Sequence, residues 1–571
     1  MGCAGDGGAI ESTDDGSTTA SAATSDSADP VGDGSTSSGV ADGTTTSTTA
    51  DASESTSGST GNPECVTPAE CAEDAQAQTA AWLEEIRDDP TELAAFLTAM
   101  PLGGDLHHHL SGAVYAEAYL AWADADGGFC VTSSSLSLST ACGDGNDVPV
   151  PTGRRDLYLD VVRAWSMADF VPTPTESGAD HFFATFAKFG AISGTRHGSM
   201  LANVRQRAAN ENVQYIEPML TSNATARTLG QAVWQGLGGG ALAQDEYATL
   251  HAAIVADPGF VAARDVLVDE VADSEAIADA EQACASAQPA AGCDVATRHQ
   301  AYISRSGSDA EIFGQMVAAY EAAIVEPRLV GLNLVGPEYG STAMSNYDQL
   351  MDMLAYLQGA YEGVSPLRLS LHAGEITAAT IPAGYALDEA DHVRKAFEVA
   401  GARRIGHGVD VLYESDPQGL LADLAAAGVL VEICLASNDI ILEVNGDEHP
   451  LHDFLAQGVP VALATDDQGV ARSSLAAEYG RAVVDLGLGY LELKAMARNS
   501  LHYAFLPGES LWEDLPQLTI TNACAPARGE TPTSQPPSAA CQALLDASAR
   551  ASQEHELERR FAEFEAQIAG G

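Results

Sequence analysis

The chain has 571 residues, of which 45% are hydrophobic and 19% charged, a composition typical of globular rather than disordered or fibrous proteins. Its 26 basic and 81 acidic side chains give a net charge of −55, which argues against nucleic acid as a partner because phosphate binding needs clustered lysine and arginine. No apolar run approaches the roughly 18–20 residues of a membrane span, which argues against a transmembrane helix.

Residues 1–62 have the composition of a tether. They carry ten acids and no lysine or arginine, and most of them are Ser, Thr, Gly, Ala or Asp. Such a segment cannot bury enough apolar surface to offset its chain entropy, so we predict that it is disordered. Cys3 stands at the start of this segment, as the lipid-carrying cysteine of a bacterial lipoprotein stands before its spacer. In that case the signal segment would lie before Met1. We therefore expect an exported protein, a cell-envelope lipoprotein or extracellular, whose membrane contact is a lipid on Cys3; the alternative is an ordinary thiol.

Eight of the ten cysteines are close neighbours in the sequence. We expect four local disulfides that staple loop-rich segments, which also favours export. The alternatives are metal binding, although no CxxC spacing occurs, and reduced cytosolic thiols. The expected pairs are Cys65–Cys71, Cys130–Cys142, Cys284–Cys293 and Cys524–Cys541.

After a predicted N-terminal helical extension over 63–100, short apolar runs alternate with helix-length segments. Seven runs read as buried strands, and we place an eighth within 185–205. This pattern predicts an α/β fold, a (β/α)8 TIM-type barrel over 101–512 with loop insertions, and a doubly wound open sheet is the second choice. The seven runs are 105–107, 213–216, 329–334, 367–372, 404–407, 430–433 and 459–464.

Three further segments interrupt or follow the predicted barrel. Two are insertions, 127–152 and 266–304, which are either a lid or docking loop or ordinary surface elaboration. The third, 513–571, is expected to be a disulfide-stapled segment followed by an amphipathic helix over 540–568 that packs against its own barrel rather than forming a dimer face.

Ionisable residues gather at the ends of four predicted strands. His107 and His109, two residues apart, point to the same face of a strand and can bind one ion, whereas His108 points the opposite way. The other three ends carry His372 with Glu375, His407 between two glycines, and the adjacent pair Asp466 and Asp467. In a barrel these ends share one mouth, where they supply metal ligands, an acid and a base for activating water.

The ordered motifs HxH, HAGE, GHG and TDD resemble the adenosine deaminase branch of the metal-dependent amidohydrolases, over roughly residues 100–512. Segments 100–117 and 497–500 are most similar to the secreted growth-factor-like deaminases and their bacterial relatives. The resemblance implies one Zn²⁺ per chain, held by His107, His109, His372 and Asp466. It also implies that Glu375 protonates purine N1, that His407 is the base or electrostatic partner of the water, that Asp467 bonds N7, and that the Gly336 backbone lies near N3.

The implied reaction is hydrolytic deamination of adenosine or deoxyadenosine to inosine or deoxyinosine and ammonia, by metal-activated water attacking C6. A purine nucleoside is thus the expected small-molecule partner, and the oligomeric state stays open. The alternatives are another aminopurine or amidohydrolase substrate at the same site, or a non-catalytic nucleoside- or partner-binding surface lipoprotein. Ser111 replaces an acid that touches the ribose 5′ side in relatives, Gln468 replaces a proline, and Asn333 replaces an aspartate expected behind the ligands.

Overall fold

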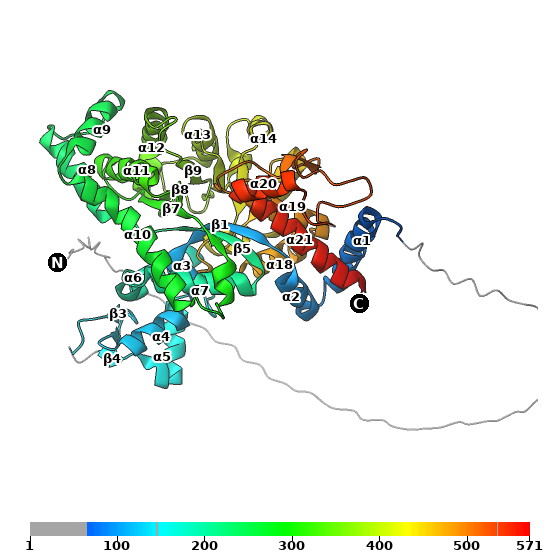
Figure 1. The fold of residues 1–571 in the computed structure, drawn as a ribbon. Coiled ribbons are helices and arrows are strands. Elements are labelled where there is room, and N and C mark those ends of the chain that lie inside the picture. The colour runs from blue at the N-terminus through cyan, green and yellow to red at the C-terminus, as the bar shows by residue number, and fades with distance from the viewer. Residues whose placement is uncertain (1–64, 144–146, 534, 571) are drawn as a thin grey trace, which may run out of the picture. The chain divides into compact units, whose positions relative to one another are not determined.

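Eight parallel strands form the centre of the computed structural model, which describes residues 65–143, 147–533 and 535–570 (Figure 1). Neighbouring strands pair in chain order, so the predicted (β/α)8 TIM-type barrel is confirmed and the open doubly wound sheet is wrong. Each strand is largely buried, as expected for strands covered by helices. The strands are β1 (Gly103–His109), β5 (Val213–Met219), β7 (His299–Ser304), β8 (Leu329–Val335), β9 (Arg368–Ala373), β10 (Arg404–His407), β11 (Leu430–Ile433) and β12 (Val461–Leu463).

Asp466, which follows β12 in the chain, closes the barrel between its last strand and its first. The backbone N–H of Asp466 donates to the His107 carbonyl at 2.9 Å, and the N–H of His109 donates to the Asp466 carbonyl at 3.0 Å. These bonds form a parallel bridge between His108 and Asp466. The seam of the barrel therefore lies within two of the predicted functional motifs.

The eighth strand is not within 185–205, where the prediction placed it. That region holds α6 (Gly178–Ser193) and the first part of α7 (His197–Asn210), and the missing strand is β7. β7 has no continuous apolar run, and its polar side chains can be buried because they have tertiary partners. Gln300 donates to the Leu106 carbonyl at 2.8 Å, and His299 Nε2 lies 2.8 Å from Glu275 Oε1.

Helices follow most of the strands, and several begin at residues that favour helix starts. Ser308 caps α11 together with Glu311, and Ser177 caps α6 together with Asp180, each pair satisfying free backbone N–H groups of the first turn. No helix among the described residues has the length and apolar character that a membrane span requires. The remaining barrel helices are α3 (Leu110–Ala113), α8 (Ala224–Gly236), α9 (Tyr247–Ala256), α10 (Phe260–Glu281), α11 (Asp309–Val325), α12 (Ser341–Ala360), α13 (His392–Glu398), α14 (Pro417–Ala427), α15 (Leu435–Leu442), α16 (Leu451–Gln457), α17 (Gln468–Ala471), α18 (Leu475–Val484) and α19 (Tyr490–His502).

The two ends of the described chain pack together on the barrel. The N-terminal helical segment is two helices, α1 (Pro68–Ile86) and α2 (Pro90–Ala99), because Asp89 and Pro90 start a new helix. The C-terminal segment also divides, at Ser548, into α20 (Ala539–Ala547) and α21 (Ala549–Gly570). The apolar face of α21 packs against α1, α19 and β5, as predicted for packing within the chain (Figure 1).

All four predicted disulfides form. Cys130–Cys142 lies in the predicted insertion 127–152, which folds with α4 (Ala116–Asp126) and α5 (Arg155–Ala164) around a small antiparallel sheet beside the barrel (Figure 1). Its strands are β2 (Cys130–Thr132), β3 (Leu138–Ser139) and β4 (Asp147–Pro149). Cys3 and the predicted tether 1–62 lie outside the described residues.

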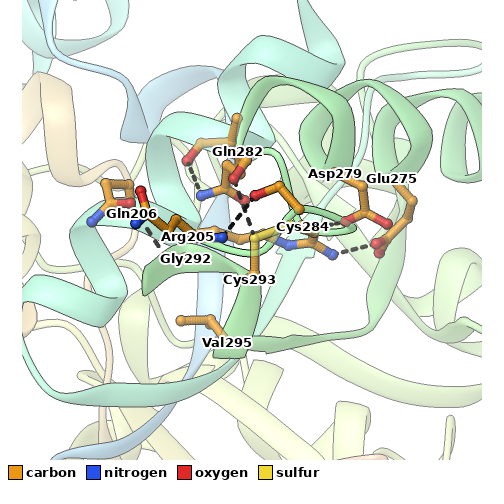
Figure 2. Close-up of a disulfide and its surroundings, with 12 residues drawn as sticks. Arg205, Gln206, Glu275, Asp279, Gln282, Cys284, Gly292, Cys293 and Val295 are labelled. Carbon is orange, nitrogen blue, oxygen red and sulfur yellow. Dashed lines mark hydrogen bonds and ion pairs between the residues drawn. A yellow bond between two sulfur atoms is a disulfide. The ribbon is translucent and has the colours of Figure 1, made fainter. Parts of the chain in front are cut away.

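The predicted insertion 266–304 is wrong as an insertion, since it contains much of α10 and the barrel strand β7. Only its middle is a loop, which Cys284–Cys293 closes (Figure 2). Next to this disulfide, Arg205 of α7 donates to Thr297 Oγ1 at 2.9 Å and to Asp279 Oδ1 at 3.0 Å. Arg205 therefore ties α7 to the residues on either side of the disulfide loop, Asp279 in α10 and Thr297 just before β7.

Candidate metal centre and active site

Four buried donors meet at the mouth of the barrel. They are His107 and His109 of β1, His372 of β9 and Asp466 after β12. His372 Nε2 lies 3.0 Å from His107 Nε2 and 3.2 Å from His109 Nε2. Asp466 Oδ1 lies 3.1 Å from His109 Nε2 and 3.7 Å from His107 Nε2. The structure thus brings together all four predicted ligands.

The donor set fits a zinc ion. Tetrahedral zinc with bonds of about 2.0–2.1 Å places its donors roughly 3.3 Å apart, which matches this spacing. Nδ1 of His107 lies 2.9 Å from Glu432 Oε2, and Nδ1 of His372 lies 2.7 Å from Asn333 Oδ1. Because both acceptors hold the ring proton on Nδ1, the Nε2 lone pairs face each other at 3.0 Å, an arrangement that calls for a cation.

Glu432 and Asn333 are therefore the groups that orient the histidines. Glu432 also accepts from Ser370 Oγ at 3.0 Å and pairs with Arg404 Nε at 2.6 Å. Burial opposes its charge, but Arg404 and His107 outweigh burial and lower the Glu432 pKa. Sequence reasoning placed Asn333 behind the ligands but missed Glu432, although a lone charge inside the apolar run 429–434 was a usable signal.

Glu375 follows the turn after β9 and lies at the edge of the donor set. Glu338 holds that turn, since its carboxylate accepts the backbone N–H of Gly374 at 3.0 Å and of Glu375 at 2.9 Å. Burial, together with the nearby charge of Asp466, raises the pKa of Glu375 well above its ordinary value. A raised pKa favours the protonated form of this carboxyl group, the form that can donate a proton.

His407, the last residue of β10, lies opposite Glu375, with its Nε2 3.7 Å from Glu375 Oε1. Both His407 and Asp466 adopt left-handed backbone angles, with φ of +69° and +55°, a strain that proteins retain mainly at functional sites. Burial lowers the pKa of His407 to about 3, so the ring is neutral. Gly406 allows this packing, because a Cβ there would lie 2.5 Å from His107 Cε1.

A cavity of about 500 Å³ opens beside the donors, and the three predicted substrate contacts line it. Burial raises the pKa of Asp467 to about 8, and its Oδ1 has no hydrogen-bond partner among the described residues. Gly336, with φ of +116°, turns the chain after β8, and Ser111 lies in α3 beside His109. The cavity is thus polar at the barrel mouth.

Part of the cavity lining is aromatic, a feature that sequence reasoning missed. Four phenylalanines of α6, spaced for one helical face, line it together with Tyr302 of β7. The phenylalanine spacing was visible in the sequence, but the assignment of a strand to 185–205 hid it. These residues are Phe182, Phe183, Phe186 and Phe189.

Comparison with known proteins finds one matching family model and several relatives of known sequence. The sequence model described as adenosine deaminase matches residues 241–513. An adenine deaminase of Sinorhizobium medicae is 35% identical over 193 residues, covering 33% of this chain and 52% of the relative. An adenosine deaminase of Shewanella loihica is 29% identical over 212 residues, covering 36% of this chain and 57% of the relative. The chain thus spans about half the length of the curated relatives it matches.

Solved structures are similar at lower identity. An adenine deaminase of Arthrobacter aurescens is 20% identical with a TM-score of 0.41, covering 71% of this chain and 94% of that one. An Arabidopsis N6-mAMP deaminase is 19% identical with a TM-score of 0.46, covering 74% of this chain and 98% of that one.

The matched region 241–513 contains His372, Glu375, His407, Asp466 and Asp467, each at the end of a barrel strand or in the loop after it. With the eight-stranded barrel and the ordered motifs, this match identifies residues 241–513, slightly less than half of the chain, as similar to the adenosine deaminase family of the amidohydrolase superfamily.

Proposed function

We propose that the protein catalyses the zinc-dependent hydrolytic deamination of adenosine and deoxyadenosine, releasing ammonia and forming inosine or deoxyinosine. The observation that carries this proposal is the placement of Glu375, His407 and Asp467 around four donors that suit one zinc ion. Zinc held by His107, His109, His372 and Asp466 would lower the pKa of water to about 7 and so supply a nucleophile at neutral pH.

The chain's own residues would then act on the purine. Glu375, which retains its proton, would donate it to N1, which makes C6 electrophilic. His407 would orient the water that attacks C6. Asp467, with its raised pKa, would donate a hydrogen bond to N7, and the backbone at Gly336 would contact the ring near N3.

A nucleoside rather than a nucleotide is the proposed substrate. The cavity of about 500 Å³ is large enough for a base and its ribose, and the described residues that line it include no lysine or arginine. A 5′-phosphate would therefore lack a cationic partner.

Adenine is the second candidate substrate, because several of the curated relatives are named adenine deaminases. Purified protein assayed for ammonia with adenosine, deoxyadenosine, adenine and AMP, before and after removal of metal by a chelator, separates the candidates. Turnover of adenosine that is lost on chelation and restored by zinc is the expected result. Turnover of adenine alone would select the second candidate, and binding without turnover would point to a non-catalytic nucleoside-binding protein.

We further propose that the protein is exported and that a lipid on Cys3 holds it at the cell envelope. The four disulfides support this proposal, since such bonds persist in oxidising compartments. Intact cells given adenosine should then release inosine into the medium. Appearance of inosine only after lysis would contradict the proposed location without touching the proposed reaction.

A further inference from the structure

A chain of buried hydrogen bonds runs from His407 away from the cavity. Nδ1 of His407 lies 3.0 Å from Asn438 Nδ2, in α15. Asn438 Oδ1 lies 3.1 Å from His449 Nε2, and His449 Nδ1 lies 3.2 Å from the backbone nitrogen of Leu451 at the start of α16. His407, Asn438 and His449 are almost completely buried, so water does not compete for these bonds.

At the far end of this chain of hydrogen bonds, the donor and the acceptor are fixed. The backbone N–H of Leu451 can only donate, so Nδ1 of His449 must offer a lone pair. A ring that accepts at Nδ1 carries its proton on Nε2, which therefore donates to Asn438 Oδ1. Burial, which lowers the pKa of His449 to about 4, agrees with a neutral ring.

The Asn438 side-chain amide extends this order of donors and acceptors to the active site. Because Asn438 Oδ1 accepts from His449, its NH₂ group must face His407 and donate to Nδ1. Nδ1 of His407 is then an acceptor, and the ring proton lies on Nε2. That nitrogen is buried, has no hydrogen-bond partner among the described residues, and is the one that faces Glu375.

We propose that Asn438 and His449 are positioning residues that hold His407 as an Nε2–H donor toward the reacting centre. The inference rests on the proposed deamination and deepens it, since it assigns His407 a direction. In this form His407 donates a hydrogen bond to the oxygen that attacks C6 and holds it in the direction of attack. It does not present a lone pair that could remove a proton.

The decisive variant is Asn438→Asp, which keeps the shape but replaces the NH₂ donor with an acceptor. Its carboxylate would still accept from His449 and would draw the His407 proton to Nδ1, reversing the tautomer. A wrongly held tautomer of a catalytic histidine costs about 10⁴-fold in kcat in the serine proteases. We expect Asn438→Asp to lower kcat for adenosine by about 10²–10⁴-fold while KM changes less than about threefold and zinc content is kept.

His449→Gln and His452→Gln test the outer residue and the specificity of the effect. A glutamine at 449 has both an N–H for Asn438 and an oxygen for the Leu451 N–H, so it should recover most of the activity that His449→Leu loses. His452 lies three residues further on, in α16, but its ring bonds the Leu486 carbonyl instead, and its substitution should leave kcat unchanged. Loss of kcat in His452→Gln equal to that in His449→Leu would show a general effect on packing and overturn the proposal.

Nitrogen-15 NMR of histidine-labelled, zinc-loaded protein reads the tautomer without any turnover. Wild-type His407 should show a protonated Nε2 and a bare Nδ1, and Asn438→Asp the reverse. A wild-type His407 protonated on Nδ1 would overturn the inference even if every assay agreed. If the wild-type protein deaminated no purine, the proposed function would fail, whereas the NMR result would still decide the tautomer.

Discussion

Glu375 shows how one side chain can be tuned by what surrounds it. It is buried, its turn is held by Glu338, and its pKa is raised well above the ordinary value, so it is suited to give up a proton rather than to bind metal. Glu375→Gln keeps a hydrogen-bond donor but cannot transfer a proton. We expect kcat to fall about 10²–10⁴-fold with zinc content unchanged.

The measurement is steady-state ammonia release with metal content determined on the same sample. Glu398→Gln is a suitable control, because Glu398 is an exposed residue of α13 that pairs with Arg394 on the surface. Equal turnover by Glu375→Gln and the wild type would contradict the assignment of Glu375 as the acid.

Glu432 and Glu217 form a matched pair on the two sides of Arg404. Arg404 lies 2.6 Å from a carboxylate oxygen of each, and both glutamates are fully buried, but only Glu432 reaches His107. Groups that orient metal-binding histidines are worth about 10–100-fold in metal affinity. Glu432→Gln should therefore weaken zinc binding by about that factor.

Competition with a chromophoric chelator measures this affinity. Glu217→Gln should lose comparable thermal stability, because it too leaves Arg404 with one carboxylate, yet it should keep wild-type zinc affinity. The same loss of affinity in both variants would assign the effect to Arg404 and the barrel interior rather than to His107.

At the scale of elements, the loop before β7 depends on its disulfide. Cys284–Cys293 closes a loop with a sequence separation of 9 between α10 and β7, and Gly292 and Arg205 tie this region to α7 (Figure 2). Replacing both cysteines with serine should cost about 2–3 kcal/mol, because the unfolded chain gains loop entropy. Hydrogen exchange should rise first in 283–297.

The serine pair at Cys130 and Cys142 is the control, since that disulfide staples the small sheet beside the barrel. It should loosen 130–149 and leave exchange in β7 unchanged. Faster exchange across the whole barrel in either variant would contradict the local role given to these bonds.

The C-terminal helix α21 is the second element with a measurable contribution. Phe561 is fully buried where α21 meets α19, and Lys494 of α19 pairs with Glu565 at 2.5 Å. Phe561→Ala should lower the free energy of unfolding by about 3–5 kcal/mol. Gln567→Ala, on the exposed side of the same helix, should have little effect on the free energy of unfolding. If Phe561→Ala keeps the mass and the low-temperature activity of the wild type, the stability that it loses comes from packing.

For the whole molecule, the dominant physical property is a net charge of −55. Mutual repulsion of so many carboxylates opposes the compact state, and salt screens it, with a Debye length of about 10 Å at 0.1 M. The thermal midpoint of the zinc-loaded protein should rise as NaCl increases from 10 to 500 mM. A midpoint that falls over this range would mean that attractive surface pairs outweigh repulsion.

Much of the barrel and of the candidate site could be predicted from the sequence, because seven strands contain short apolar stretches and most of them end in a polar or ionisable residue. The eighth could not, since Gln300 and His299 of β7 are satisfied only by partners distant in the sequence, Leu106 and Glu275. The donors were visible as motifs. The residues that orient the side chains of the site were mostly not visible, because a hydrogen bond such as that between Asn438 of α15 and His407 of β10 depends on how a helix and a strand meet in space.

The seam of the barrel gives the site a mechanical consequence. The peptide group of Asp466 joins the last strand to the first, while its carboxylate lies among the three histidines. An ion that binds only when these groups are assembled must, by linkage, favour the closed ring by its own binding free energy. Bound zinc would then stabilise the closed barrel as well as take part in the reaction. The amide protons of Asp466 and His109 would exchange more slowly when it is bound.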